Sequence, residues 1–284
     1  MRTAVLMWLL AMPCALAAQA PPNALEANLA KAKADYDRDP SNVDNAIWLG
    51  RRLAYLGRFT EAIDAFTQGI AKHPNEPRLY RHRGHRYITT RRFDLATADL
   101  KKAAQLIAGK KDEIEPDGAP NKAGVPRSTL QSNIWYHLGL AQYLAGDFPG
   151  ALASYREGMT VSRVNDDMLV ATSDWLYMTL RRLERDEEAR RVLAPIREQM
   201  DVLENGAYHA RLLMYKGLRT PESVLNLNTA DDIQIATQGY GVGNWYLVNG
   251  DRAKARDLFG RVLAGKATTA FGFIAAEADV KRGF

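Results

Sequence analysis

Cysteine is almost missing from this chain, because Cys14 is the only one among 284 residues. It lies in an apolar stretch near the start, so the rest of the chain has no thiol. This lack excludes disulfides, thiol catalysis and cysteine metal sites beyond that stretch. A thiol-free chain suits an oxidising compartment, where a free thiol is a liability.

A hydrophobic run long enough to span a bilayer is also lacking at the start, where the apolar run extends only from Val5 to Leu16. Arg2 precedes the run, and Ala15-Leu16-Ala17 follows the small-x-small pattern of a cleavage site. This order indicates a secretory signal peptide over residues 1–17. We expect an exported, periplasmic or secreted chain with no stable membrane span after cleavage, and an uncleaved anchor is the alternative.

A strong charge of one sign is absent as well. Lys and Arg total 38 against 33 Asp and Glu, a formal net charge of +5. Basic residues gather in YRHRGHRYITTRRF, residues 80–93, but one basic helix offers few phosphate contacts. We therefore expect no nucleic-acid partner.

Catalytic patterns are scarce too. None of the five histidines belongs to an H-E-x-x-H or similar ligand motif. The pairs Asp166-Asp167 and Asp231-Asp232 each precede a helical pattern, where Asp is expected to cap free N–H groups. GYGVG, residues 239–243, lacks the full G-x-G-x-x-G motif. We expect no catalytic residue, no cofactor and no metal, and so no enzyme.

What the chain does contain is an internal repeat with an offset of 34 residues. The matching pairs of the first two units are Gly50 and Gly84, Phe59 and Phe93, Ala62 and Ala96, and Phe66 and Leu100. Each unit contains two helical patterns separated by a turn. A fixed period of this length predicts a solenoid of helix-turn-helix units.

The clearest unit is NIWYHLGLAQYLAGDFPGALASYREG. It carries Trp135-x2-Leu138-Gly139 and then Ala151-x3-Tyr155, and these spacings resemble those of the tetratricopeptide repeat (TPR) family. Gln142 departs from the family's usual aromatic residue, and Arg163 replaces the closing proline. The resemblance implies an all-α solenoid whose small residues let paired helices approach closely.

The organisation of the whole chain follows from this repeat. Gly139 and Gly243 are 104 residues apart, which leaves room for two divergent units between them. We expect an all-α solenoid of about six TPR units with capping helices at both ends. The expected segments after the signal peptide are an N-terminal capping helix (22–42), units one and two (43–107), an insertion (108–131), units three to six (132–266) and a C-terminal capping helix (267–284).

The insertion between units two and three is rich in proline and glycine. Pro116, Pro120 and Pro126 prevent a continuous helix there. A long loop in a compact domain is often functional, and a tolerated surface excursion is the alternative.

In TPR proteins, the first helices of the units line a concave groove through set repeat positions. The resemblance carries these positions to eight groove residues, which would make the groove basic at one end and aromatic beyond it. They are Ile47, Arg51, Arg78, Arg81, His85, Tyr136, Leu140 and Tyr143.

This groove suggests a non-enzymatic scaffold of the cell envelope that holds a protein or extended peptide partner, acidic in part. The alternative function is an accessory module of envelope assembly or transport that binds a glycan or another anionic ligand through the basic groove. For the residues themselves two further interpretations stay open. The arginines could form a solvated helix face, and Tyr136 and Tyr143 could be packing residues.

Overall fold

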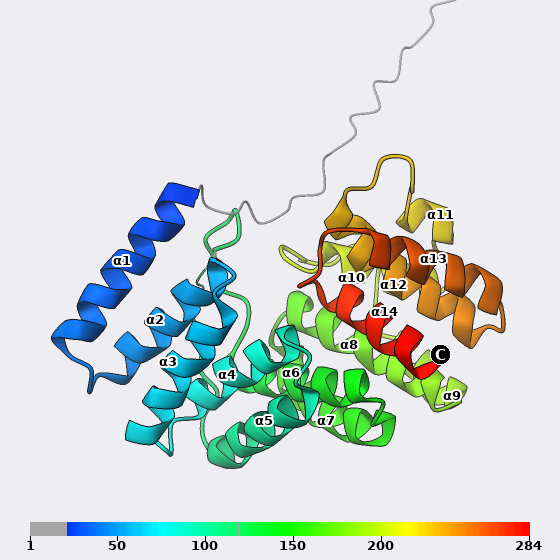
Figure 1. Cartoon of the computed structure of the whole chain (residues 1–284). Helices are drawn as coiled ribbons and strands as arrows, with labels where there is room; N and C mark the ends of the chain where they lie inside the picture. Colours follow the sequence, from blue (N-terminus) through cyan, green and yellow to red (C-terminus); the bar gives the residue numbers. More distant parts are fainter. Residues whose placement is uncertain (1–21, 117, 119) are drawn as a thin grey trace, which may run out of the picture.

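The computed structural model describes residues 22–116, 118 and 120–284 (Figure 1). The expected signal peptide, residues 1–17, lies outside the described residues. The α-helices are α1 (Pro22–Arg38), α2 (Val43–Tyr55), α3 (Phe59–Lys72), α4 (Pro77–Thr89), α5 (Phe93–Ile107), α6 (Leu130–Ala145), α7 (Phe148–Val161), α8 (Asp166–Arg182), α9 (Asp186–Val192), α10 (Gly206–Tyr215), α11 (Pro221–Val224), α12 (Asp232–Val248), α13 (Arg252–Ala264) and α14 (Phe271–Arg282). Within the described part, the only other regular features are a 3-10 turn at Ser162–Val164 and one isolated β-bridge.

The helices form consecutive antiparallel pairs, which Figure 1 shows stacked side by side from α1 at one end of the array. The main pairs are α2 with α3, α4 with α5, α6 with α7, α8 with α9 and α12 with α13. Each pair also packs on the next, so the apolar face of one unit is covered by its neighbour. The expected all-α solenoid is confirmed.

The repeat glycines explain how the helices of a pair can approach so closely. A Cβ atom built on Gly139 would lie 2.6 Å from the Tyr155 ring, a distance that real Cβ contacts do not reach. The same holds in three other units. The corresponding distances are 2.4 Å from Gly50 to Phe66, 2.8 Å from Gly84 to Leu100 and 2.7 Å from Gly243 to Phe259. Gly243 is therefore a packing glycine of its unit.

A buried ion pair joins the first helices of the two divergent units. Arg211 on α10 binds Asp174 on α8, and both side chains are buried. Arg211 occupies the space beside Gly241 on α12, where a Cβ would come within 2.2 Å of it. The second helix of the fifth unit, α11, has only four residues. Units four and five thus keep the stacking without the repeat's usual residues.

Only one of the two Asp pairs caps a helix as expected. Asp231 caps α12 through a capping box with Gln234. The N-cap of α8 is instead Asn165, and the prediction for Asp166-Asp167 was wrong. Asp167 is fully buried, and its carboxylate accepts three backbone N–H groups. They belong to Leu203, Glu204 and Asn205, at 2.9, 2.8 and 2.9 Å.

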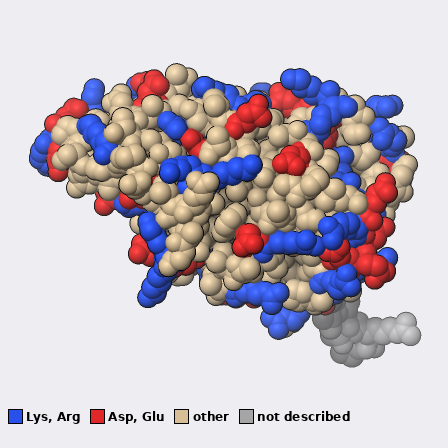
Figure 2. Space-filling model, turned by 90° about the horizontal axis from the view of Figure 1, so that it is seen from below, with Lys and Arg blue, Asp and Glu red and all other residues tan. Residues whose placement is uncertain are grey.

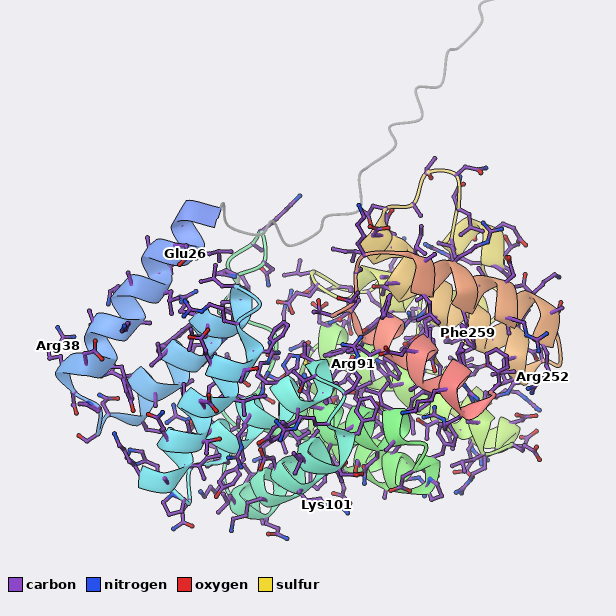
Figure 3. All side chains as sticks on the ribbon, in the orientation of Figure 1. Glu26, Arg38, Arg91, Lys101, Arg252 and Phe259 are labelled. Carbon is purple, nitrogen blue, oxygen red and sulfur yellow. The ribbon has the colours of Figure 1, made fainter. Side chains whose placement is uncertain are left out.

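The C-terminal helix α14 does more than cover the last pair. It packs on α12 and α13 and also contacts α6 in the middle of the chain. Arg91, in the turn after α4, donates from Nε to Glu277 at 2.7 Å and from Nη2 to the Thr268 carbonyl at 2.8 Å. Figure 3 shows Arg91 beside the start of α14. None of the described helices is long and apolar enough to cross a membrane.

Candidate functional site

The insertion lies across the first helices of the N-terminal units. Its Glu115 is buried and contacts α4, with Oε2 3.2 Å from Arg81 Nε and Oε1 3.3 Å from His82 Nε2. Asn133 on α6 donates to the same carboxylate at 2.8 Å. Because Arg81 occupies a groove position of the repeat, the insertion covers the surface where a ligand of a TPR solenoid was expected.

The insertion also reaches α2, in the first unit. Arg52 donates to the Gly118 carbonyl at 3.1 Å. A Cβ at Gly118 would lie 1.8 Å from the Tyr55 hydroxyl and 2.7 Å from Arg51 Nη2, so a larger residue there would displace the ends of these two side chains. Arg51 and Arg52 place their guanidinium carbons 4.5 and 4.8 Å from the centre of the Trp48 ring, in cation–π contact.

Further along, the insertion is tied to the loop between α9 and α10. Arg127 forms an ion pair with Asp201 at 2.7 Å, and its carbonyl accepts the Asn165 side chain at 2.8 Å. Asn121 donates to Glu204 at 2.7 Å. The segment therefore connects unit one with units four and five, and it is not a free surface excursion.

A second stretch of the expected groove is covered by the start of α14. The Phe271 ring lies 5.4 Å from His85, 5.8 Å from His137 and 6.3 Å from Tyr136, measured between ring centres. His85 and His137 are 4.4 Å apart. Burial, followed by the nearby arginine charges, lowers the pKa of both histidines well below its usual value. Their rings are therefore neutral near pH 7.

Three of the eight predicted groove residues are interior residues. Ile47 is 4% exposed, and Leu140 and Tyr143 are fully buried, so the expectation that they face an open groove is corrected. Tyr143 accepts a hydrogen bond from Tyr240 at 2.7 Å, and burial raises its pKa to about 12. The packing interpretation of Tyr143 is the one that fits. Tyr136 is partly buried, and its hydroxyl lies 3.3 Å from that of Tyr208.

The predicted arginines do not form a uniformly solvated face. Arg78 is bound to Glu76 at 2.8 Å and to Asp44 at 2.7 Å, so its charge is balanced. The Arg81 side chain is only 11% exposed and faces Glu115. Arg51 is partly exposed and donates from Nε and Nη2 to the Tyr55 hydroxyl.

Several residues of this surface were missed by the sequence reasoning. Three of them directly follow a predicted groove residue in the sequence, namely Trp48, Arg52 and Arg86. Tyr55 lies one helical turn after Arg51, and Glu115 belongs to the insertion. Arg86 is partly buried and lies over the Phe59 ring at 5.8 Å. The high density of arginine along α2 and α4 was the available signal.

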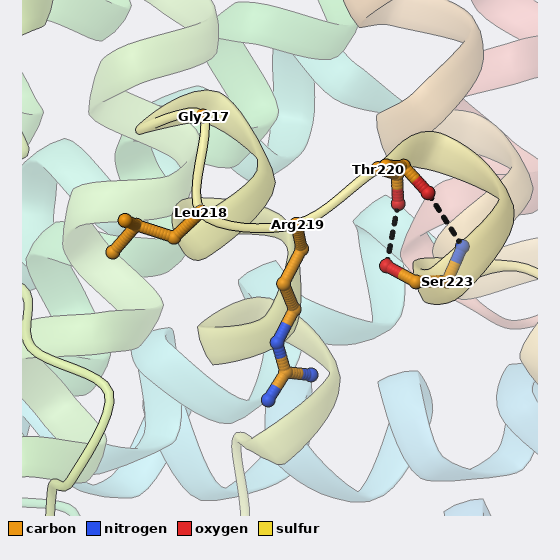
Figure 4. A pocket seen from close by; sticks show the side chains of 5 residues that line it. All are labelled: Gly217, Leu218, Arg219, Thr220 and Ser223. Atoms are coloured by element: carbon orange, nitrogen blue, oxygen red, sulfur yellow. Dashed lines mark hydrogen bonds between the residues drawn. The ribbon is translucent and has the colours of Figure 1, made fainter.

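Two other clefts lie elsewhere on the surface and contain no buried charged side chain. A cleft of about 460 Å³ between α10 and α11 is lined by Gly217, Leu218, Arg219, Thr220 and Ser223 (Figure 4). Its polar contacts, drawn there, are the local bonds between Thr220 and Ser223. A cleft of about 670 Å³ lies between α5, α6 and α7 and contains Lys101, Trp135 and Glu157. Neither hollow gathers buried charge.

The described residues offer no set of three His, Cys, Asp or Glu side chains placed to hold a metal ion. Viewed from below the orientation of Figure 1, the surface carries charges of both signs around uncharged areas (Figure 2). No continuous field of one sign covers that face.

No model of a known protein family matches the sequence, and no curated protein does. Among solved structures, a tetratricopeptide repeat protein from Parabacteroides merdae matches at 13% identity with a TM-score of 0.50, over 89% of this chain and 93% of its own. The fold is that of a TPR solenoid. The TPR protein YrrB, described as having an unusual peptide-binding site, is 13% identical with a TM-score of 0.47, over 88% of this chain and 97% of its own.

Proposed function

We propose that this TPR protein is a non-enzymatic scaffold of the cell envelope that holds an extended segment of a partner protein. The binding surface, called here the N-terminal groove, is made by Trp48, Arg51, Arg52 and Tyr55 on α2 and by Arg81 and Arg86 on α4. Of the predicted groove residues it contains Arg51 and Arg81, and the insertion lies against it through Glu115 and Gly118. The start of α14 covers His85 and Tyr136 instead.

One observation carries this proposal. The N-terminal groove already binds an extended, non-helical segment, namely the chain's own insertion around Glu115 and Gly118. It uses a backbone carbonyl as acceptor and a carboxylate as counter-charge, and both groups occur in any acidic peptide. A surface that holds one such segment has the chemistry to hold another beside it.

The envelope location rests on the sequence of residues 1–17, with their basic start, apolar run and small residues before the expected cleavage site. The absence of thiols from the rest of the chain agrees with an oxidising compartment.

The test is site-specific photo-crosslinking in living cells, followed by mass spectrometry of the captured proteins. A photo-reactive phenylalanine analogue at Trp48 samples the N-terminal groove, and the same analogue at Lys101, exposed on α5, is the matched control. We expect a discrete partner from position 48 that position 101 does not capture. Equal capture at both positions, or capture at neither, would contradict the proposal.

A further inference from the structure

We propose that Arg51 and Arg86, together with Arg81, form a carboxylate-binding site that receives an acidic side chain of the bound segment. The site lies between α2 and α4, next to Glu115 of the insertion. This inference rests on the proposed function, because it names the chemistry that the N-terminal groove selects in its partner.

Positive charge is in local excess at this site. Among the residues that the structure describes, Glu115 is the only carboxylate that forms an ion pair with any of the three arginines. Arg51 is bonded to a neutral phenol, the Tyr55 hydroxyl, at 3.3 and 3.4 Å. Arg86 contacts the Phe59 ring and pairs with no described carboxylate. Among the described residues, the three guanidinium groups thus face a single carboxylate, that of Glu115.

The three arginines are close enough to act on one another. Burial, and then the charges of Arg81 and Arg51, lower the pKa of Arg86 to about 10. Burial also lowers the pKa of Arg81, with Glu115 acting in the opposite direction and Arg51 in the same one. Withdrawing like charges from water without counter-charge is costly, and an incoming anion would remove part of that cost.

An unsatisfied donor points the same way. The Arg81 Nε–H group is buried and has no hydrogen-bond partner of good geometry, although the Glu115 carboxylate lies 3.2 Å away. Buried polar groups in native proteins are nearly always hydrogen-bonded, and exceptions occur at binding sites. The ion pair between Arg81 and Glu115 is thus not reinforced by a well-aligned hydrogen bond from Nε.

The surroundings favour a carboxylate on a peptide over a free anion. The contacts of Glu115 show that a carboxylate binds beside Arg81 and His82. The bond from Arg52 to the Gly118 carbonyl shows that the neighbouring position accepts a peptide backbone. Trp48 and Tyr55, both partly exposed, add aromatic surface for an apolar neighbour of the acidic residue.

The inference is tested by fluorescence anisotropy, with the full chain titrated into two labelled peptides. One alternates Glu and Leu, and the other has Gln in place of every Glu. A hydrogen bond to a charged carboxylate is stronger than one to a neutral amide, so we expect the Glu peptide to bind at least roughly tenfold more tightly, which corresponds to about 1.4 kcal/mol. Arg86→Gln should remove most of that preference, whereas Arg86→Lys, which keeps the charge, should retain part of it.

Arg261→Gln is the matched control, because Arg261 lies on α13 in an exposed pair with Asp257, far along the chain from the N-terminal groove. It should bind both peptides as the native chain does. If Arg86→Gln changes the helical circular dichroism, Arg51→Gln takes its place, since Arg51 is partly exposed and its side chain donates to the Tyr55 hydroxyl.

The outcomes separate this inference from the proposed function. Equal affinity for both peptides in the native chain and in Arg86→Gln overturns the carboxylate site but leaves a peptide-binding groove in place. Arg86-dependent binding of inorganic phosphate, with neither peptide bound, overturns the peptide assignment in favour of a small anion. Failure of all three probes overturns the site, and the crosslinking experiment at Trp48 then decides the proposed function by itself.

Discussion

Gly139 on α6 packs directly against the ring of Tyr155 on α7, with no room between them for a methyl group. We therefore expect Gly139→Ala to destabilise the chain, because the new Cβ would lie 2.6 Å from the ring and force the helices apart. Overpacking of this kind costs about 1–3 kcal/mol. Urea denaturation followed by circular dichroism measures the change.

The matched control is Gly260→Ala on α13, where a Cβ would meet nothing within 4 Å. There the same substitution should stabilise the helix by about 0.5–1 kcal/mol, because glycine is a poor helix former. If both substitutions changed the free energy of unfolding by the same amount and in the same direction, the packing explanation for Gly139 would be wrong.

The attachment of α14 depends on Asp279, which is fully buried. Its carboxylate binds Arg182 and accepts hydrogen bonds from Tyr240 at 3.0 Å and Arg282 at 2.5 Å. Asp279→Ala leaves buried donors without a partner, so we expect a loss of about 3–5 kcal/mol in unfolding free energy.

Asp257→Ala serves as the control for Asp279→Ala, since Asp257 forms an exposed pair with Arg261 on the surface of α13. Exposed pairs of this kind contribute at most about 1 kcal/mol. A comparable loss of unfolding free energy in the two variants would show that the contacts of Asp279 do not hold α14 in place.

The histidine cluster predicts how stability depends on pH. Burial, and then nearby arginine charges, lower the pKa of His82, His85 and His137 below the value of about 6.5 expected in the unfolded chain. The unfolded chain therefore takes up protons first as the pH falls. Stability should be complete above about pH 6.5 and decrease below it. The dependence of stability on pH is measured as the urea midpoint between about pH 5.5 and 7.5.

His85→Gln removes one of these titrating groups and should flatten the slope. A ring in contact with His137 and Phe271 would be replaced by a neutral amide of smaller volume, so some loss of stability at every pH accompanies the change. A slope identical to that of the native chain would exclude His85 as a contributor.

The processing prediction concerns residues 1–17. If they are a signal peptide, the intact mass of the protein recovered from the exported fraction should correspond to a chain that begins at Ala18. A mass that includes Met1–Ala17 would support the uncleaved anchor instead.

The sequence was sufficient for the fold because the repeat is a local pattern. Gly84 and Leu100 are only 16 positions apart, and their contact, like that of Gly139 and Tyr155, is made within one helix pair. Residue type at such positions follows from the distance between two neighbouring helices. The all-α architecture and the stacking of helix-turn-helix units could therefore be predicted.

The candidate site was predictable only in part, because it depends on contacts between distant segments. The expectation for Leu140 and Tyr143 assumed an open groove, whereas Tyr143 is enclosed with residues such as Tyr240 and Asn244 from far along the chain. The path of the insertion could not be foreseen either. Its residues have no periodicity, so nothing in the sequence placed Glu115 beside Arg81.

The contact between Arg91 and Glu277 joins residues 186 positions apart. In an ordinary repeat array each unit needs only its neighbours, and folding can spread from any point. Here the surface around His85 is completed only when α14 arrives from far along the chain, and such closure slows the search for the native state. The chain should therefore refold more slowly than an open array of equal length. Until α14 docks, the chain exposes the aromatic surface around His85, which is prone to association.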